Sequence, residues 1–198
     1  MCVTITDDLR QRTQCLLSAA KARKVTGMVR RNFRRLDCQD LLLIYKTYIR
    51  PHLEYCIQSW SPYLRKKDIQ CLEGVQRAIT KLVPALRKLD YRQRLQKLRL
   101  TTLETRRRRD DLIETFKIMT GKEKVSGEQF FHFSTIGYQT RGHSLKIAKQ
   151  RTYRLDLRKH FFSQRVVNEW NSLPQHVKGF DSEHVQELTG QVLARYEQ

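Results

Sequence analysis

Apolar residues recur at steps of three and four along most of the chain, which is the spacing of one face of an α-helix. The clearest case lies between Tyr45 and Val83, where Pro51 and Pro62 interrupt the pattern. Because proline lacks the amide hydrogen that a helix interior needs, we expect one helix, or two helices broken near Pro51, then a basic turn and a second helix that begins near Asp68. The repeated positions are Ile44, Tyr48, Ile49, Leu53, Ile57 and Trp60, followed by Ile69, Leu72, Val75, Gln76, Ile79, Leu82 and Val83.

Helical spacing also predicts elements on both sides of this stretch. Thr6 to Asp8 can cap a first helix that ends near Gly27 or a few residues later, with Leu9, Leu16, Leu17, Ala20 and Val25 as its apolar side. Capping signals start further helices at Asp37, Asp90 and Thr101. The remaining predicted helices cover about 159–172, where Phe161, Phe162, Val166, Val167 and Trp170 share a face, and a last segment after Asp181 or Ser182.

The stretch 121–155 interrupts this helical character. It contains most of the turn-forming glycines and an aromatic group at Phe130, Phe131 and Phe133, so we expect loops with short extended pieces and a hairpin near 153–155. The sequence therefore predicts a mainly α protein, a helical bundle followed by a mixed loop and helix region with little β structure. We place one region at 1–83 and a second at 84–198.

The charge of the chain suggests what it binds. It carries 39 Lys and Arg against 20 Asp and Glu, a formal net charge of +19 over 198 residues. Polyphosphate backbones are the commonest partner of a folded chain this basic, so the sequence predicts RNA or an RNA–DNA duplex as partner. The candidate binding residues are Arg30, Arg31, Arg34 and Arg35; Arg65, Lys66 and Lys67; Arg106, Arg107, Arg108 and Arg109; Arg141 and His143; and Arg151, Arg154, Arg158 and Lys159.

Each of these groups also has a simpler interpretation. A single run of basic residues is more often a solvated helix face, and the turn with Arg141 and His143 is either a phosphate-contacting loop or a surface turn. Four tyrosines near two of the clusters could stack on bases, but their helical spacing makes core or rim packing the default interpretation. They are Tyr45, Tyr48, Tyr55 and Tyr63.

The sequence gives only weak indications of catalytic or metal-binding residues. The adjacent pair Asp110 and Asp111 lies in a helical pattern, where neighbouring side chains point about 100° apart and do not converge on a metal pair. We expect these carboxylates on a solvated face or paired with Arg106 and Arg107. His52 and Cys56 could share a metal on a helix with Cys71 as a third ligand, but small core cysteines explain them better. We therefore predict no metal, no cofactor and no small-molecule substrate.

The number of cysteines and the length of the apolar runs indicate the cellular compartment. Five cysteines are odd in number and widely spread, which argues against a disulfide framework and fits a reducing environment. No apolar run approaches the roughly 18 residues that span a bilayer. The sequence predicts an intracellular protein, nuclear or cytoplasmic, without a membrane partner.

Several segments together carry a family resemblance. Ile49-Arg50-Pro51-His52-Leu53-Glu54-Tyr55-Cys56 and Trp60-Ser61-Pro62 are followed, in order, by a Leu103–Ile113 segment, by Thr140-Arg141-Gly142-His143, and by a Phe161–Pro174 segment that contains Trp170-Asn171-Ser172-Leu173-Pro174. The chain thereby resembles the region downstream of the reverse-transcriptase domain in jockey-like LINE (non-LTR) retrotransposon polyproteins. The resemblance covers about Val3 to Pro174.

The resemblance implies a thumb-like region at 1–83, in which residues 1–6 are the remnant of the last palm strand and Met1 marks a truncated reading frame. The parent family is an RNA-directed DNA polymerase that uses magnesium, and this chain has no paired carboxylates of that kind. It implies a fragment that binds RNA or RNA–DNA duplex without sequence preference and has no polymerase activity alone. The missing palm, or a second copy, would be a further partner. The alternative is a helical structural or protein-interaction module, or a nonfunctional retrotransposon remnant.

Overall fold

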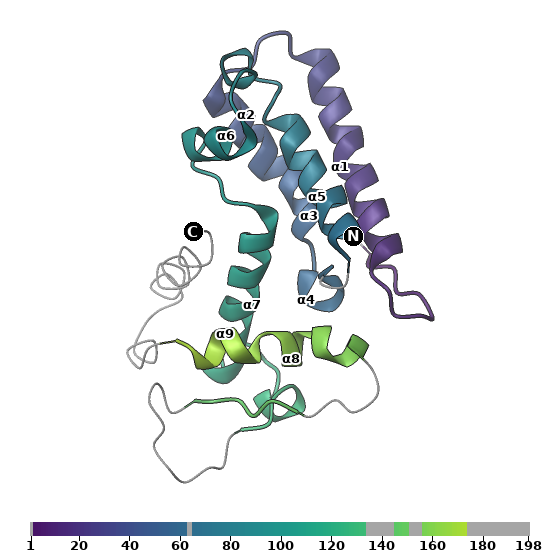
Figure 1. The fold of residues 1–198 in the computed structure, drawn as a ribbon, viewed down its shortest axis with the longest axis vertical. Coiled ribbons are helices and arrows are strands. Elements are labelled where there is room, and N and C mark those ends of the chain that lie inside the picture. The colour runs from purple at the N-terminus through teal and green to yellow at the C-terminus, as the bar shows by residue number, and fades with distance from the viewer. Residues whose placement is uncertain (1, 63–64, 134–144, 151–155, 174–198) are drawn as a thin grey trace. The chain divides into compact units, whose positions relative to one another are not determined.

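The structure is a computed structural model that describes residues 2–62, 65–133, 145–150 and 156–173 (Figure 1). It is mainly helical, which confirms the predicted fold class. Within the described residues there is no β-strand, and extended pairing is limited to one antiparallel bridge between Phe133 and Ile147. The chain divides into two compact units, Met1–Arg106 and Arg107–Gln198, hereafter unit 1 and unit 2.

Unit 1 is built around three helical rods. In Figure 1, α1 and α5 run side by side in the same direction, and the continuous segment from α2 to α3 runs the opposite way. Its elements are α1 (Arg12–Asn32), α2 (Cys38–Ile44), the π-helix η1 (Tyr45–Ile49), α3 (Arg50–Glu54), α4 (Ile57–Trp60), α5 (Lys66–Ile79), the 3-10 helix η2 (Pro84–Leu86), α6 (Tyr91–Lys97) and the start of α7 (Leu103–Met119).

The first helix differs from the prediction in its start and in its buried face. Thr6 to Asp8 form a turn, Leu9 follows with a left-handed φ of 51°, and α1 begins only at Arg12. The core side of α1 consists of small and polar residues, while Leu16 and Leu17 are exposed. Small side chains permit close approach of neighbouring helices, so packing overrides the local apolar pattern. The buried set is Gln14, Cys15, Ser18, Ala19, Ala22 and Val29.

Of the two alternatives for the segment around Pro51, one helix or two helices broken near the proline, the structure shows continuous helical backbone. The backbone stays helical from α2 to the end of α3, and the π-helical segment η1 directly precedes the proline. In η1 the Arg50 amide donates to Tyr45 O, five residues back. A π turn shifts the carbonyls against which a proline ring would clash in a regular α-helix, and this explains how Pro51 is accommodated. The break comes at Cys56, which has a left-handed φ of 54°.

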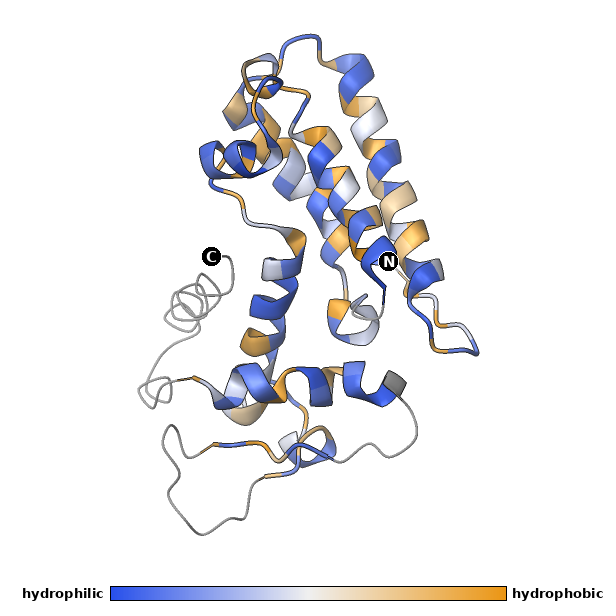
Figure 2. Ribbon diagram, viewed as in Figure 1, coloured by the Kyte–Doolittle hydropathy of each residue, from blue (hydrophilic) through white to orange (hydrophobic). Residues whose placement is uncertain are grey.

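The core of unit 1 follows the predicted periodicity of the second helix. Leu72, Val75 and Ile79 are fully buried, and Val83 joins them just beyond the end of α5. Figure 2 shows apolar and polar segments alternating along these helices, as expected for rods with one buried side. Asp68 lies in the first turn of α5, where a carboxylate suits the exposed amides, as predicted.

A buried polar network joins α5 to the segments that follow it. The Tyr45 hydroxyl donates to Gln76 Oε1, and Gln76 Nε2 donates to Tyr91 Oη at 3.1 Å and to the Thr101 carbonyl at 2.9 Å. Tyr91 in turn donates to Glu73, whose other oxygen accepts from the Leu103 amide at 3.1 Å. Burial raises the pKa of Tyr91 above its ordinary value of 10.0, and the negative charge of Glu73 raises it further.

The capping signals read from the sequence at Asp37 and Asp90 are confirmed, and the signal at Thr101 is displaced by one residue. Asp90 and Gln93 form a reciprocal capping box at α6. At α7 the capping atom is Thr102 Oγ1, which accepts from the Thr105 amide at 3.1 Å, so the cap lies one residue later than the Thr101 start that we expected.

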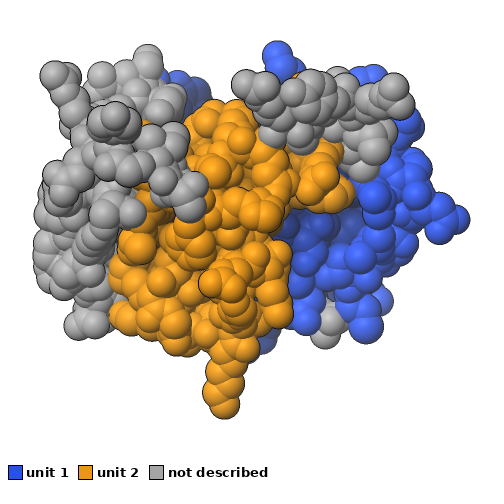
Figure 3. Space-filling view, turned by 90° about the horizontal axis from the view of Figure 1, so that it is seen from below, with its two compact units in different colours: residues 1–106 blue, residues 107–198 orange. Residues whose placement is uncertain are grey.

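The division between the units falls after Arg106, whereas the sequence suggested a boundary after Val83 (Figure 3). Leu86, Leu98 and Leu103 pack into the same core as α1 and α5, so the residues after Val83 complete the first bundle. Residues 2–6, interpreted as a strand remnant, are irregular, and the Thr4 amide donates to Gln14 Oε1 of α1 at 2.9 Å.

Unit 2 packs the rest of α7 against two short helices and an extended segment. Its further elements are η3 (Gly127–Gln129), η4 (Asp156–His160), α8 (Phe162–Arg165) and α9 (Val167–Asn171). The predicted helix over 159–172 is thus present in pieces. The core contains Leu112, Phe116, Phe131, Ile147, Val166, Val167, Trp170 and Leu173. The expected hairpin at 153–155 and helix after Asp181 lie outside the described residues.

Side chains of α8 and α9 hold the extended residues 145–150 through their backbone. Asn171 accepts from the Ile147 amide at 3.0 Å and donates to the Ile147 carbonyl at 2.9 Å. Trp170 Nε1 donates to Leu145 O at 2.8 Å, and Gln164 Oε1 accepts from the Gln150 amide at 3.1 Å. The Trp-Asn pair of the C-terminal motif therefore has a structural role in unit 2.

Candidate nucleic-acid interface

The positive charge of the chain is concentrated in unit 1. Residues 1–106 contain 23 Lys and Arg and 9 Asp and Glu, a formal charge of +14 out of the total of +19. A surplus of this size on about half of the chain creates a potential that attracts polyanions.

Most acidic side chains of unit 1 are engaged within the fold. Glu73 and Asp68 are 7 % exposed, and Glu54 forms ion pairs with Arg50 at 3.4 Å and with Arg106. Asp37 and Asp90 cap helices. Carboxylates used in this way do little to neutralise the exposed surface, so the lysines and arginines dominate it.

The first predicted cluster is fully exposed at the end of α1. Arg30 and Arg31 occupy its last turn, and Arg34 and Arg35 follow in the connection to α2. Within the described residues no ion pair involves these four side chains. The negative end of the helix dipole stabilises cations in the last turn, as expected from the sequence. Four exposed guanidinium groups on one short stretch are more than this stabilisation of the helix end requires.

The second predicted cluster lies at the opposite end of the bundle. Arg65, Lys66 and Lys67 are exposed where α5 begins, and α5 runs in the same direction as α1. Since α1 has 21 residues and rises about 1.5 Å per residue, the two clusters are separated by roughly 30 Å along the bundle. The structure places both on unit 1 and does not merge them into one site.

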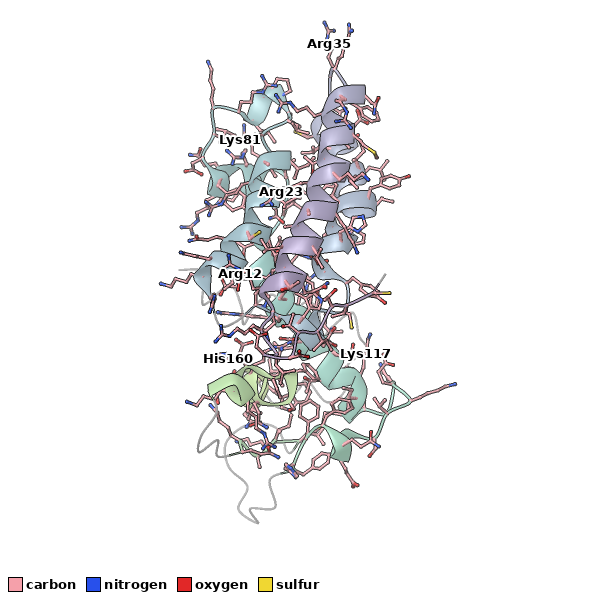
Figure 4. All side chains as sticks on the ribbon, turned by 90° about the vertical axis from the view of Figure 1, so that its right-hand side faces the viewer. Arg12, Arg23, Arg35, Lys81, Lys117 and His160 are labelled. Carbon is pink, nitrogen blue, oxygen red and sulfur yellow. The ribbon has the colours of Figure 1, made fainter. Side chains whose placement is uncertain are left out.

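Further cations that sequence reasoning did not single out lie between these ends. Figure 4 shows Arg12 and Arg23 on α1, with Arg35 beyond its end and Lys81 beyond the end of α5. Arg23 Nη2 donates to the Cys71 carbonyl at 3.3 Å, which ties its guanidinium to the seam between α1 and α5. Arg12, Arg23 and Arg30 are separated by eleven and seven residues, a spacing that places them on one side of a helix. This spacing was the signal in the sequence that could have identified them.

The third cluster is largely taken up by the fold. Arg106 forms a two-point ion pair with Glu54, and Arg107 is 2 % exposed. Arg108 lies 3.8 Å from Glu169 and Arg109 lies 3.9 Å from Asp110. These four side chains are partly or fully buried, so they add little to the exposed basic surface.

The acidic pair beside that cluster corrects the sequence prediction. Asp111 is 2 % exposed, so it does not lie on a solvated face. Its two carboxylate oxygens accept from Arg165 Nε at 2.8 Å and from Arg165 Nη2 at 2.7 Å. This bidentate ion pair joins α7 to α8 and gives the carboxylate a structural role.

The last predicted cluster, Arg151, Arg154, Arg158 and Lys159, is described only in part. Arg158 and Lys159 are exposed, and Arg158 donates to Gln150 Oε1 at 2.8 Å. Arg141, His143, Arg151 and Arg154 lie outside the described residues.

The tyrosines divide between core and surface. Tyr45 is buried and bonded to Gln76, and burial, followed by the charge of Glu54, raises its pKa. Tyr48 and Tyr55 are 62 % and 43 % exposed. Tyr63 lies outside the described residues. Two of the four tyrosines are therefore accessible for stacking.

The described residues show neither a cluster of metal-binding side chains nor a helix that could span a membrane. The described residues contain no group of three or more His, Cys, Asp and Glu side chains that could hold a metal ion. Cys56 is exposed at the start of α4, and Cys71 is half-buried beside Arg23. None of the described helices combines the length and the apolar character needed to cross a bilayer.

Comparison with known proteins gives no assignment: no protein-family model, no curated protein and no solved structure matches the chain.

Proposed function

We propose that the chain binds RNA or RNA–DNA duplex through the exposed lysines and arginines of unit 1, without sequence preference, and that it derives from the thumb and downstream region of a LINE-type reverse transcriptase. The observation that carries the binding proposal is the exposed cationic surplus of unit 1, whose carboxylates are mostly engaged in caps and buried pairs. The sequence motifs alone support the family origin.

The binding mechanism is electrostatic. Each lysine or arginine that approaches a phosphate displaces a condensed counterion, and this release drives association. Contacts of this kind position a nucleic acid without reading its bases. Seven exposed side chains, Arg30, Arg31, Arg34, Arg35, Arg65, Lys66 and Lys67, supply the contacts that we propose.

The test is a binding titration of the full chain with RNA duplex and RNA–DNA duplex at increasing salt. With six or more phosphate contacts, we expect affinity to fall by about 10³-fold between about 50 and 200 mM salt, and to be the same for duplexes of unrelated sequence. An affinity that does not change with salt would sink the proposal.

A second candidate function is a protein-interaction module. It is favoured by large apolar side chains on the surface of unit 1, among them Leu43 at 68 % and Tyr48 at 62 % exposure. Light scattering with and without RNA separates the two candidates, because an interaction module self-associates or stays unchanged when RNA is added.

A further inference from the structure

The outward side of α1 combines apolar side chains with cations. Leu16, Leu17 and Met28 are 45 %, 42 % and 46 % exposed, although a helix buries such residues where it can. Ala20 and Gly27 lie on the same side, since residues three, four and seven apart share a helix face. We call these five residues the α1 stripe. In Figure 2, apolar segments remain visible along this outer helix of unit 1.

Cations lie within and beside the α1 stripe, and α1 contains no acidic residue. Lys21, Lys24 and Arg31 are exposed on this side, and Arg23 and Arg30 lie along the edge toward α5. Within the described residues no ion pair involves these five cations. By helical spacing, Lys24 and Arg31 project from within the stripe, and Lys21, Arg23 and Arg30 border it, so the face mixes apolar and positive side chains.

Gly27 provides a second, independent observation. Glycine inside a helix is less stable than alanine, so its presence normally reflects a backbone or packing need. Here the backbone is helical, and a Cβ atom would meet only the Arg31 side chain, at 4.0 Å. The fold of unit 1 places only the flexible end of the Arg31 side chain over Gly27, so a backbone from another molecule has room to approach once that side chain turns aside.

We propose that the α1 stripe is a docking surface for an acidic amphipathic helix of a partner protein. The apolar side of that helix would cover Leu16, Leu17 and Met28, and its backbone would approach at Ala20 and Gly27. Its carboxylates would pair with the flanking lysines and arginines. This inference does not depend on nucleic-acid binding.

Charge and chemistry argue against the other occupants. A phosphate backbone offers no apolar surface. Leu16, Leu17 and Met28 would therefore stay exposed to water in a complex with nucleic acid. A second copy of the chain would set the same cations against one another, because α1 brings no carboxylate to the contact. An anionic membrane surface suits an uninterrupted apolar face bordered by cations, whereas Lys24 and Arg31 lie among the apolar residues of this face and would enter the acyl region, so carboxylates of a partner helix suit them better.

The test uses the full chain and a fluorescent synthetic peptide of about five helical turns, with leucines on one stripe and glutamates beside it. We expect saturable anisotropy changes with a Kd in the micromolar range. Two matched peptides serve as controls, one with lysine in place of glutamate and one with the same residues in scrambled order. Both should bind at least about tenfold more weakly. Equal binding of the scrambled peptide would overturn the proposal, because charge alone would then explain it.

Surface variants locate the site. L16Q/L17Q/M28Q changes only exposed positions and should weaken the acidic peptide by at least about tenfold, whereas L43Q/Y48Q, which changes another exposed apolar pair, should not. R34Q/R35Q should also leave peptide binding unchanged. Failure of the triple variant to weaken the peptide, or its loss of binding to phosphatidylserine vesicles while peptide affinity stays intact, would contradict the assignment.

Alanine substitutions at Gly27 and Gly74 separate an effect on peptide binding from an effect on helix stability. G27A and its matched control G74A in α5 each add a methyl group with no opposing atom closer than 4 Å. Both should raise the thermal midpoint, because alanine favours the helix. Only G27A should weaken peptide binding, by about tenfold. If G27A raises the midpoint and leaves the peptide affinity unchanged, the partner helix does not approach at Gly27 and the proposal is wrong.

Discussion

At the scale of single residues, the pair Asp111 and Arg165 stabilises unit 2. Their side chains are 3 % and 6 % exposed, and removing one member leaves an uncompensated buried charge. We expect D111N to lower the free energy of unfolding of unit 2 by about 3–5 kcal/mol. Trp170 fluorescence in a W60F background would measure this by urea titration, because Trp170 belongs to the core of unit 2.

The neighbouring carboxylate is the matched control for that substitution. Asp110 is 26 % exposed and lies 3.9 Å from Arg109, a geometry worth little. D110N should cost less than about 1 kcal/mol. Equal losses for D110N and D111N would show that the buried pair has no special role.

Substitution of Cys56 by glycine should increase the free energy of unfolding, in contrast to the aspartate substitutions. Its left-handed φ of 54° is costly for a side chain with a Cβ atom and free for glycine. C56G should therefore raise the stability of unit 1 by about 0.5–1 kcal/mol. S59G, three residues later inside α4, should lower it by a similar amount. Thermal unfolding followed by circular dichroism compares the two, and a destabilised C56G would contradict the strain that we assign.

At the scale of elements, the network around Tyr91 fastens α6 and the start of α7 to α5. Y91F removes the hydroxyl shared by Glu73 and Gln76 and should cost about 1–3 kcal/mol. The matched control Y48F removes an exposed hydroxyl and should cost almost nothing. A Y91F protein as stable as the wild type would show that the network is not needed.

Alkaline pH tests the same network. Because the pKa of Tyr91 is higher in the folded chain than its ordinary value of 10.0, the contribution of the neutral phenol is complete below about pH 10 and is lost as the pH rises above it. Unfolding at constant urea should therefore become easier above about pH 10. Y91F should reduce the pH slope by up to about 1.4 kcal/mol per pH unit, and an unchanged slope would refute the assignment.

Local signals predicted some of these elements and missed others for physical reasons. The capping box of Asp90 and Gln93 depends on residues three apart, so the sequence alone shows it. The buried face of α1 depends on which helices surround it, and Leu16 looked like core because spacing does not reveal close helix approach. Asp111 and Arg165 are 54 positions apart, beyond any local pattern.

At the scale of the whole molecule, the division of charge between the units could be calculated from the sequence only once the boundary was known. The resemblance implied a boundary after Val83, whereas Leu86 and Leu98 complete the first core. The same knowledge separates the exposed cluster at Arg34 and Arg35 from the third cluster, where Arg107 is buried. Burial, and not the number of cations in a run, distinguishes a candidate contact from a structural residue.

Polymerase activity depends on where the carboxylates of the chain lie. A reverse transcriptase holds two magnesium ions with paired carboxylates that converge on the primer end, whereas Asp111 is committed to Arg165. We expect no primer extension on an RNA template by the purified chain with magnesium. Incorporation above a heat-inactivated control would disprove this prediction.

The salt dependence of RNA duplex binding, compared for two double variants of the full chain, shows which unit contacts the phosphates. R34Q/R35Q removes two exposed charges from unit 1, and K122Q/K124Q removes two exposed charges from unit 2. If unit 1 provides the phosphate contacts, R34Q/R35Q reduces the slope of log affinity against log salt by about 1.8, and K122Q/K124Q leaves it unchanged. Equal slopes for the two variants would contradict a binding surface on unit 1.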